Sequence, residues 1–134
     1  METKVVACAV IEKDDLLLLG RKANGVGPYP DCWHLLGGKI KSGEGIFDAL
    51  KREVREESGI ELKEIEPLFF DEDIQPDKHG VKTHFIFLSF KAKYASGDLT
   101  PSEEIVELKW FAKNKLSDLT PPSNKLFKKL GLLK

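Results

Sequence analysis

The chain contains little cysteine. Its two cysteines, Cys8 and Cys32, are far apart in the sequence and form no CxxC pair. This pattern indicates neither a disulfide framework nor a structural zinc site, and it favours a reducing compartment. We therefore expect a cytoplasmic protein.

The sequence also lacks a long apolar run. Its longest such run, Val5–Ile11, falls far short of the ~20 residues that a membrane-spanning helix needs. Charged residues at positions 12–15 follow this run, where a signal peptide would have a small-residue cleavage site. We therefore expect neither a membrane anchor nor a secretory signal.

Neither sign of charge is in marked excess. The 21 Lys and Arg residues nearly balance the 22 Asp and Glu residues, giving a net charge of −1, which argues against a basic nucleic-acid surface or a polybasic membrane anchor. With 134 residues, of which 41% are hydrophobic, and no repeat or linker, the sequence predicts one domain over residues 1–134. A monomer and a homodimer are both compatible with these features.

Hydrophobic periodicity and turn residues predict strands with helices between them. We expect strands at 5–11, 16–19, 33–36, around 65–71, at 81–94 and at 105–112, a loop at 23–30, and helices at 46–58 and 124–130. Gly37 and Gly38 should stop the third strand, Gly59 should end the first helix, and Pro121 and Pro122 should precede the second. The predicted fold class is α/β (α+β), with a mixed sheet between helices.

The helix at 46–58 has a distinctive distribution of charge. On a helical wheel, Ile46, Phe47, Leu50 and Val54 form an apolar stripe that should face the core. The residues opposite should face water, and they are Asp48, Lys51, Arg55 and Ser58. Three glutamates, Glu53, Glu56 and Glu57, lie on the shoulder between these faces.

Three neighbouring carboxylates repel one another. Each like-charge i,i+3 or i,i+4 pair costs a few tenths of a kcal/mol, and anions near a helix C-terminus are disfavoured further. Arg52 can offset one charge through Glu56. A divalent cation would replace repulsion with coordination, and oxygen ligands favour Mg²⁺, Mn²⁺ or Ca²⁺. From these residues alone, an ordinary solvated helix face is the alternative.

The helix belongs to a longer pattern that resembles the Nudix box. The chain matches that motif at every specified position. The matching pattern is Gly38, five residues, Glu44, seven residues, Arg52-Glu53-Val54, one residue, Glu56-Glu57, one residue and Gly59-Ile60. The preceding segment 33–38 is similar to the strand and turn that lead into the box, with Leu36 where the family usually has proline. This departure relaxes the turn but removes no metal ligand. The resemblance implies the Nudix α/β/α sandwich around a central mixed sheet.

The resemblance also implies an activity and a set of residue roles. Nudix enzymes hydrolyse a nucleoside diphosphate linked to another moiety, with Mg²⁺ or Mn²⁺ as the cofactor. By resemblance Glu56 and Glu57 are the main metal ligands, and Glu53 is a ligand or the general base. The resemblance also implies that the carbonyl of Gly37 would complete the ligand set. Arg52 would orient a carboxylate of the cluster, and Glu44 would brace the box helix.

A further metal ligand is expected on the loop before the last strand. Glu104 falls six residues before Trp110, a spacing similar to that of the nucleotide-sanitising branch, so we prefer it to Glu103 as a ligand or catalytic residue. The alternative is that both glutamates face solvent.

Cationic residues near the box are candidates for binding phosphate. Arg21, Lys22 and Lys39 could each contact a substrate phosphate or serve as ordinary surface cations. The chain has three histidines, His34, His79 and His84. They show no metal-ligand spacing and are interpreted as structural. The aromatic residues of the strand at 85–90 are interpreted mainly as packing residues.

The segment Thr120–Asn124 is similar to the Phe-Pro-Pro-Ala-Asn segment of MutT-type enzymes, in which the asparagine contacts a purine. Asn124 is therefore a candidate for base recognition, with helix capping as the alternative. The leading hypothesis is cleavage of a (d)NTP, oxidised purine nucleotides among the candidates, to NMP and pyrophosphate. The alternatives are an ADP-ribose or nucleotide-sugar pyrophosphatase and a non-catalytic nucleotide sensor.

Overall fold

A computed structural model of the chain describes residues 1–23, 32–116, 119 and 121–131. The strands are β1 (Thr3–Lys13), β2 (Leu16–Lys22), β3 (Trp33–His34), β4 (Leu36–Lys39), β5 (Glu61–Pro76), β6 (Lys82–Ser96) and β7 (Ile105–Ala112). The helices are α1 (Ile46–Ser58), the short 3₁₀ helix η1 (Lys113–Lys115) and α2 (Pro121–Lys129). Apart from Ala23, the predicted loop at 23–30 lies outside the described residues.

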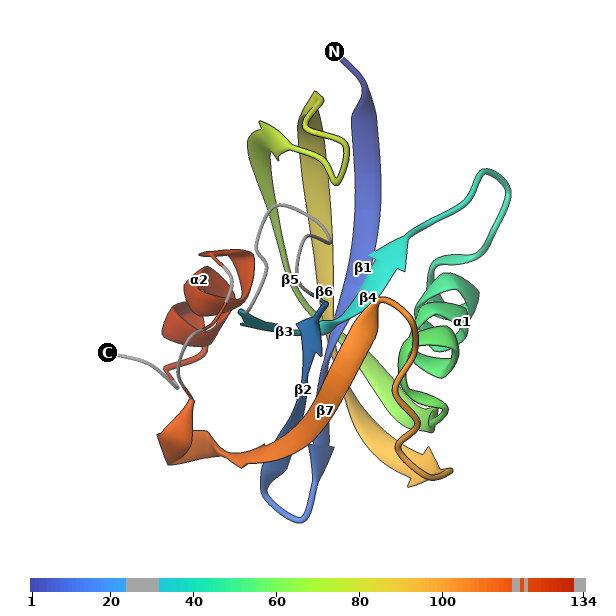
Figure 1. Cartoon of the computed structure of the whole chain (residues 1–134), viewed down its shortest axis with the longest axis vertical. Helices are drawn as coiled ribbons and strands as arrows, with labels where there is room; N and C mark the ends of the chain where they lie inside the picture. Colours follow the sequence, from blue (N-terminus) through green and yellow to red (C-terminus); the bar gives the residue numbers. More distant parts are fainter. Residues whose placement is uncertain (24–31, 117–118, 120, 132–134) are drawn as a thin grey trace.

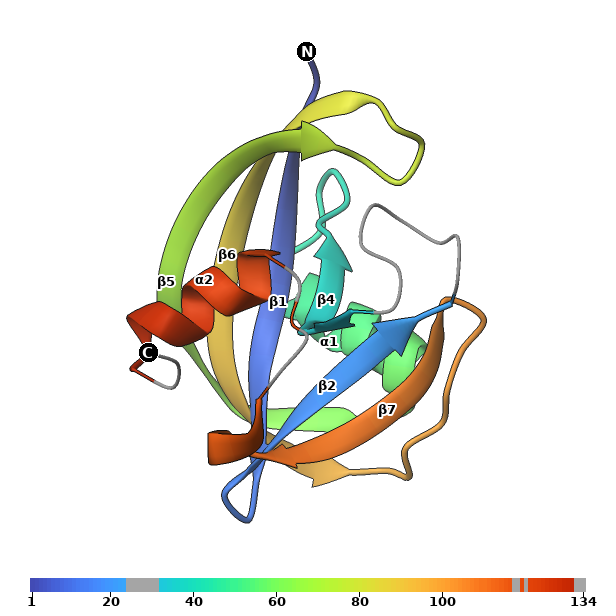
Figure 2. The ribbon, with the colours of Figure 1, turned by 60° about the vertical axis from the view of Figure 1, so that its left-hand side comes forward.

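Strand β1 organises a mixed seven-stranded sheet (Figure 1). It pairs in parallel with β6 from Thr3 to Glu12 and antiparallel with β4 from Val6 to Ala9. Strand β5 adds to β6 as the outer strand, antiparallel to it. Strands β2, β7 and β3 form a second part of the sheet. Strand β1 pairs with this part only at its C-terminal end, through Glu12 and Lys13. Figure 2 shows β2 and β7 diverging from the other strands.

The α-helices α1 and α2 lie on opposite sides of the sheet, as Figure 1 shows. Because side chains alternate along a strand, β1 contributes to two cores. Ala7, Ala9 and Ile11 pack in the cluster that includes Leu50 and Val54 of α1. Val10 packs on the other side, in the cluster that includes Leu126 and Phe127 of α2. The predicted fold class, with a mixed sheet between helices, is therefore confirmed.

Two predicted boundaries are wrong. Gly37 and Gly38 do not stop a strand, because they lie within β4, where they pair with Cys8 and Ala7 of β1. The two prolines do not precede α2 but form its first two residues. Proline is tolerated there, since the first N–H groups of a helix have no intrahelical acceptor.

The buried face of α1 also differs from the prediction at both ends of the helix. Ile46 and Phe47 are 45% and 44% exposed, although the Phe47 ring meets Phe90 edge-on. Ser58, which was expected to face water, is fully buried. Gly59 turns the chain in the left-handed conformation, and the connection between β6 and β7 covers the end of α1, where Thr100 N–H donates to the Ser58 carbonyl. In the described ranges, no helix is both long and apolar enough to cross a membrane.

Candidate functional site

A cavity of about 810 Å³ lies over one face of β1, β6 and β5. Its floor follows the register of β1 and β6, in which Lys4 pairs with Phe85, Val6 with Phe87 and Cys8 with Ser89, and all six residues line the cavity. Residues of β4, α1 and α2 and of the loop before β7 form the walls. The cavity therefore brings together segments from both halves of the chain.

Two glycines allow the carboxylates of α1 to reach this cavity past β4. A Cβ atom on Gly38 would lie 2.4 Å from the carboxylate carbon of Glu53. The N–H of Gly37 donates to Glu57 Oε1 at 2.8 Å. Any larger residue at position 38 would therefore occupy the space that the Glu53 carboxylate fills.

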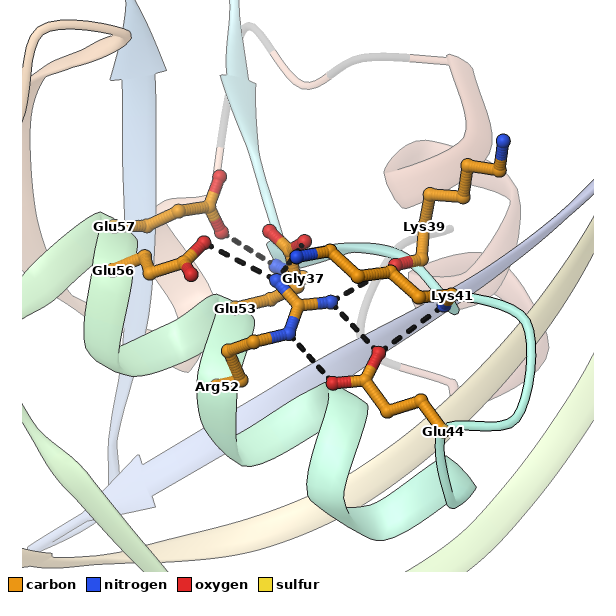
Figure 3. Close-up of polar contacts among 8 residues, drawn as sticks. All are labelled: Gly37, Lys39, Lys41, Glu44, Arg52, Glu53, Glu56 and Glu57. Carbon is orange, nitrogen blue, oxygen red and sulfur yellow. Dashed lines mark hydrogen bonds and ion pairs between the residues drawn. The ribbon is translucent and has the colours of Figure 1, made fainter.

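Arg52 connects the carboxylates of the box (Figure 3). Its Nε and Nη2 donate to the two carboxylate oxygens of Glu44 at 2.6 and 2.9 Å. Its Nη1 donates to Glu53 at 2.8 Å and to Glu56 at 3.2 Å, and Nη2 also donates to the Lys39 carbonyl. The guanidinium therefore binds the Glu44 carboxylate through two hydrogen bonds, and its Nη1 binds both Glu53 and Glu56.

The pKa values of these carboxylates differ sharply. Burial raises the pKa of Glu57 to about 8, the Gly37 N–H opposes this rise, and the charges of Glu53 and Glu104 add to it. The Arg52 hydrogen bonds instead lower the pKa of Glu44 to about 2. Glu57 therefore requires a nearby positive charge to be ionised at neutral pH, whereas Glu44 already has one.

The structure brings most of the other predicted site residues to the same cavity. Lys22, Lys39, Glu103 and Glu104 line it, and the negative charge of Glu104 raises the pKa of Glu57. Both glutamates of the loop before β7 are exposed at the cavity rim.

Arg21 and Asn124 are placed differently. Arg21 forms a 2.9 Å ion pair with Glu107 of β7, and it is not among the described residues that line the cavity. Asn124 is half-buried in the first turn of α2, and of its neighbours Ser123 and Lys125 line the cavity while Asn124 itself does not.

Several cavity residues were not recognised from the sequence. Phe85 and Phe87, interpreted as packing residues, lie on the floor with near-parallel rings 5.8 Å apart. Asp71 and Asp73 of β5 line the far side. The period-two alternation of these strands was the available signal, but it does not reveal which face of the sheet is covered by a helix and which is open.

The donor set suits a hard divalent cation, although no three Asp, Glu, His or Cys side chains in the described ranges are arranged as a metal site. Glu53 and Glu56 are both hydrogen-bonded to Arg52. Glu57 is a buried carboxylate whose pKa is strongly raised and which is close enough to Glu53 and Glu104 to be affected by their charges. Clustered carboxylate oxygens of this kind are the ligands that Mg²⁺ and Mn²⁺ favour.

Gly38→Ala should impair this site without unfolding the protein. The added methyl group would meet the end of a flexible Glu53 side chain rather than backbone, so the carboxylate can move away at little cost in stability. We expect the melting temperature to change by only a few degrees and the rate of nucleotide hydrolysis to fall at least tenfold. Gly45→Ala is the matched control, because its Cβ would lie 3.2 Å from Asp48 and outside the cavity. Equal activities of the two variants would contradict the placement of Glu53.

Comparisons with known proteins agree with this geometry. The family model for the NUDIX domain matches residues 1–130. Proteins named nucleoside triphosphatase NudI from Enterobacter sp. (strain 638) and Escherichia fergusonii are 31% and 33% identical to this chain, each over 99% of the chain and 100% of the relative.

A solved structure shares the fold over nearly its whole length. The crystal structure of a MutT NUDIX hydrolase from Burkholderia pseudomallei superposes with a TM-score of 0.85 at 26% identity, covering 97% of this chain and 99% of that one. The complete box motif, the carboxylate-lined cavity and these matches lead to one assignment. The chain belongs to the Nudix family and is a hydrolase of diphosphate bonds.

Proposed function

We propose that this protein hydrolyses nucleoside triphosphates, ribo or deoxy, to the monophosphate and pyrophosphate with the aid of Mg²⁺. The observation that carries the proposal is the carboxylate cluster of α1 at one end of a cavity large enough for a nucleotide. The two relatives named nucleoside triphosphatase NudI, which match over their full length, support the choice of substrate class. We further propose that residues 1–134 function as a single domain.

In this proposal Glu53, Glu56 and Glu57 would hold the metal, together with the Gly37 carbonyl and Glu104. A bound Mg²⁺ or Mn²⁺ neutralises charge that develops on phosphoryl oxygens and favours ionisation of the attacking water. Glu53 or Glu104 accepts the proton of that water, and Arg52 keeps the Glu53 carboxylate oriented. Glu44 in turn fixes the Arg52 guanidinium through two hydrogen bonds.

Lys22 and Lys39 are proposed to contact the substrate phosphates, because both line the cavity that the carboxylates enter. Arg21 and Asn124 are also proposed as substrate contacts. For Arg21 this contact would compete with its Glu107 ion pair, and for Asn124 it would require approach from the first turn of α2.

The test of the proposal is a panel of nucleotides incubated with Mg²⁺, with released pyrophosphate and orthophosphate measured separately. Pyrophosphate released from nucleoside triphosphates supports the proposal. Turnover confined to ADP-ribose or nucleotide sugars would identify the alternative pyrophosphatase class. Nucleotide binding without any turnover would identify a sensor.

Divalent metal should stabilise the fold through the same carboxylates. A ligand that binds only the folded state raises the free energy of unfolding by mass action, by about 2.7 kcal/mol at a hundredfold excess over its Kd. We expect millimolar Mg²⁺ or Mn²⁺ to raise the melting temperature by several degrees and EDTA to reverse the shift, measured by calorimetry. Ca²⁺ should also stabilise the fold but support less turnover, because its looser geometry positions water poorly. Hydrolysis that persists in EDTA would contradict the proposed mechanism.

A further inference from the structure

His34 lines the cavity, and one nitrogen of its imidazole ring has no partner among the described residues. This nitrogen has almost no accessible surface, so a group in the cavity reaches it only when the wall around the ring shifts. Its side chain is only 8% exposed and lines the cavity. Nδ1 lies 2.7 Å from the carbonyl oxygen of Leu35. Nε2 is buried and has no hydrogen-bond partner among the residues that the structure describes. Buried polar atoms in native proteins nearly always have a partner, so this atom requires an explanation.

The Leu35 contact determines what Nε2 can do. A carbonyl oxygen only accepts hydrogen bonds, so Nδ1 must carry the hydrogen and donate it. Burial also lowers the pKa of His34 to about 4, which keeps the ring neutral at pH 7. In this tautomer Nε2 is a lone-pair acceptor. The partner that completes the site must therefore donate a hydrogen.

Two parts of a bound nucleotide complex are poor partners for Nε2, and they are the phosphates and a metal cation. Phosphate oxygens at neutral pH are acceptors and cannot satisfy an acceptor. The positive charge of Lys22, which lowers the pKa of the ring in addition to the larger effect of burial, raises the electrostatic cost of a second cation at Nε2. A neutral N–H or O–H group remains as the partner, and in a nucleotide only the base and the sugar carry such groups.

The position of His34 in the fold agrees with this assignment. The Leu35 N–H donates to Ser123 Oγ of α2, so His34 lies where β3 and β4 approach α2. The carboxylates of α1 enter the cavity beside Gly37 and Gly38, which come a few residues after His34 in the sequence. A substrate with its phosphates at the carboxylates would extend its nucleoside toward α2 and His34.

We propose that His34 binds the nucleoside part of the substrate, with Nε2 accepting a hydrogen bond from a base N–H or a sugar hydroxyl. This inference rests on the proposed function, since it assumes that a nucleotide occupies the cavity. From the sequence His34 is interpreted as structural, and its Nδ1 bond to the Leu35 carbonyl agrees with that interpretation. The second nitrogen supplies the binding function.

The direct test is ¹⁵N NMR of the three histidine rings in the wild-type protein. A nucleoside monophosphate is titrated in EDTA, so that no turnover occurs, and inorganic pyrophosphate is titrated separately. We expect the Nε2 resonance of His34 to shift with the nucleotide and not with pyrophosphate. The internal controls are His79, which is exposed, and His84, which is half-buried and paired with Glu72. An unchanged His34 resonance when backbone amides report saturation, or an equal shift with pyrophosphate, would overturn the inference.

Two variants extend the test to catalysis. His34→Phe keeps the ring and removes the acceptor, so KM for nucleoside triphosphates should rise about fivefold, as for one lost neutral hydrogen bond, with kcat within about twofold. His34→Gln places an amide oxygen near the Nε2 position and should recover part of the loss. His84→Phe is the matched control, since His84 is not among the described residues that line the cavity. Circular dichroism checks that each variant is folded.

Substrate analogues then identify the donor. Comparison of ribo- with deoxyribonucleotides, guanosine with inosine, and cytidine with uridine triphosphates shows which missing group abolishes the effect of His34→Phe. An effect of equal size on every substrate, including inorganic tripolyphosphate, would overturn the inference and leave the proposed function intact. Absence of any nucleoside triphosphate turnover by the wild type would instead overturn the proposed function, while the NMR titration still decides whether His34 contacts a nucleoside.

Discussion

Glu57→Gln is expected to lower nucleotide turnover at least a hundredfold and at the same time to stabilise the protein in EDTA. The loss of turnover follows from the proposed metal site, because the amide removes the charge of a ligand at the centre of the carboxylate cluster. The gain in stability follows from burial. The Glu57 carboxylate lies in an environment that disfavours its charged form, and glutamine can still accept the Gly37 N–H bond with its carbonyl oxygen.

The pH dependence of stability gives this prediction a definite sign. Folding raises the pKa of Glu57 from 4.5 to about 8, so between these values the folded state retains a proton that the unfolded state has lost. The free energy of unfolding must then fall as pH rises through this window, by an amount on the order of a few kcal/mol. Without divalent metal, the wild type should lose stability from pH 5 to pH 8 relative to Glu57→Gln.

Urea denaturation in EDTA at several pH values measures this difference, and Glu56→Gln is the matched control. Glu56 is on the same helix, but its side chain is 58% exposed. Its substitution should reduce turnover as a proposed metal ligand while leaving the pH dependence of stability unchanged. A parallel pH profile for wild type and Glu57→Gln would show that Glu57 is not the group that titrates. Turnover by Glu57→Gln at more than a tenth of the wild-type rate would contradict its role in the site.

The sequence predicted α1 accurately because the signals for it are local. Its bounds, Ile46–Ser58, and the left-handed Gly59 that follows agree with the prediction. The box spacing also placed Glu53, Glu56 and Glu57 together, since residues three and four apart share one helix face. Periodicity did not reveal how the ends of the helix are covered. The burial of Ser58 depends on a segment about forty positions later in the chain.

The remainder of the cavity depends on pairings between distant segments. The parallel pairing of β1 with β6 places Val6 beside Phe87 and Cys8 beside Ser89, and no local pattern specifies that register. His34 illustrates the same limit. Its spacing relative to other histidines carries no signal, whereas its unpartnered Nε2 becomes visible only when the packing around β3 and α2 is known.

Gly37→Ala is expected to have the largest effect on stability of any single substitution discussed. Gly37 has φ +149°, and a Cβ atom there would lie 2.0 Å from the Ala7 carbonyl oxygen and 2.6 Å from the Cα of Cys8. Both contacts are with the backbone of β1, which is hydrogen-bonded to β4 on one side and to β6 on the other. No side-chain rotation relieves these clashes, so the strands themselves would have to separate.

Gly43→Ala separates this steric effect from the cost of a positive φ. Gly43 has φ +79°, but a Cβ atom there would have no described atom within 4 Å. It should therefore lose only the ~1 kcal/mol typical of a non-glycine residue in the left-handed region. Gly37→Ala adds overpacking, typically ~1–3 kcal/mol, against neighbours that cannot move independently. We expect a total loss near the upper end of this sum, about 4 kcal/mol, which is a large part of the ~5–15 kcal/mol that stabilises a domain. Urea denaturation of the two variants measures the difference, and similar losses would show that β4 does not approach β1 as closely as the Gly37 contacts require.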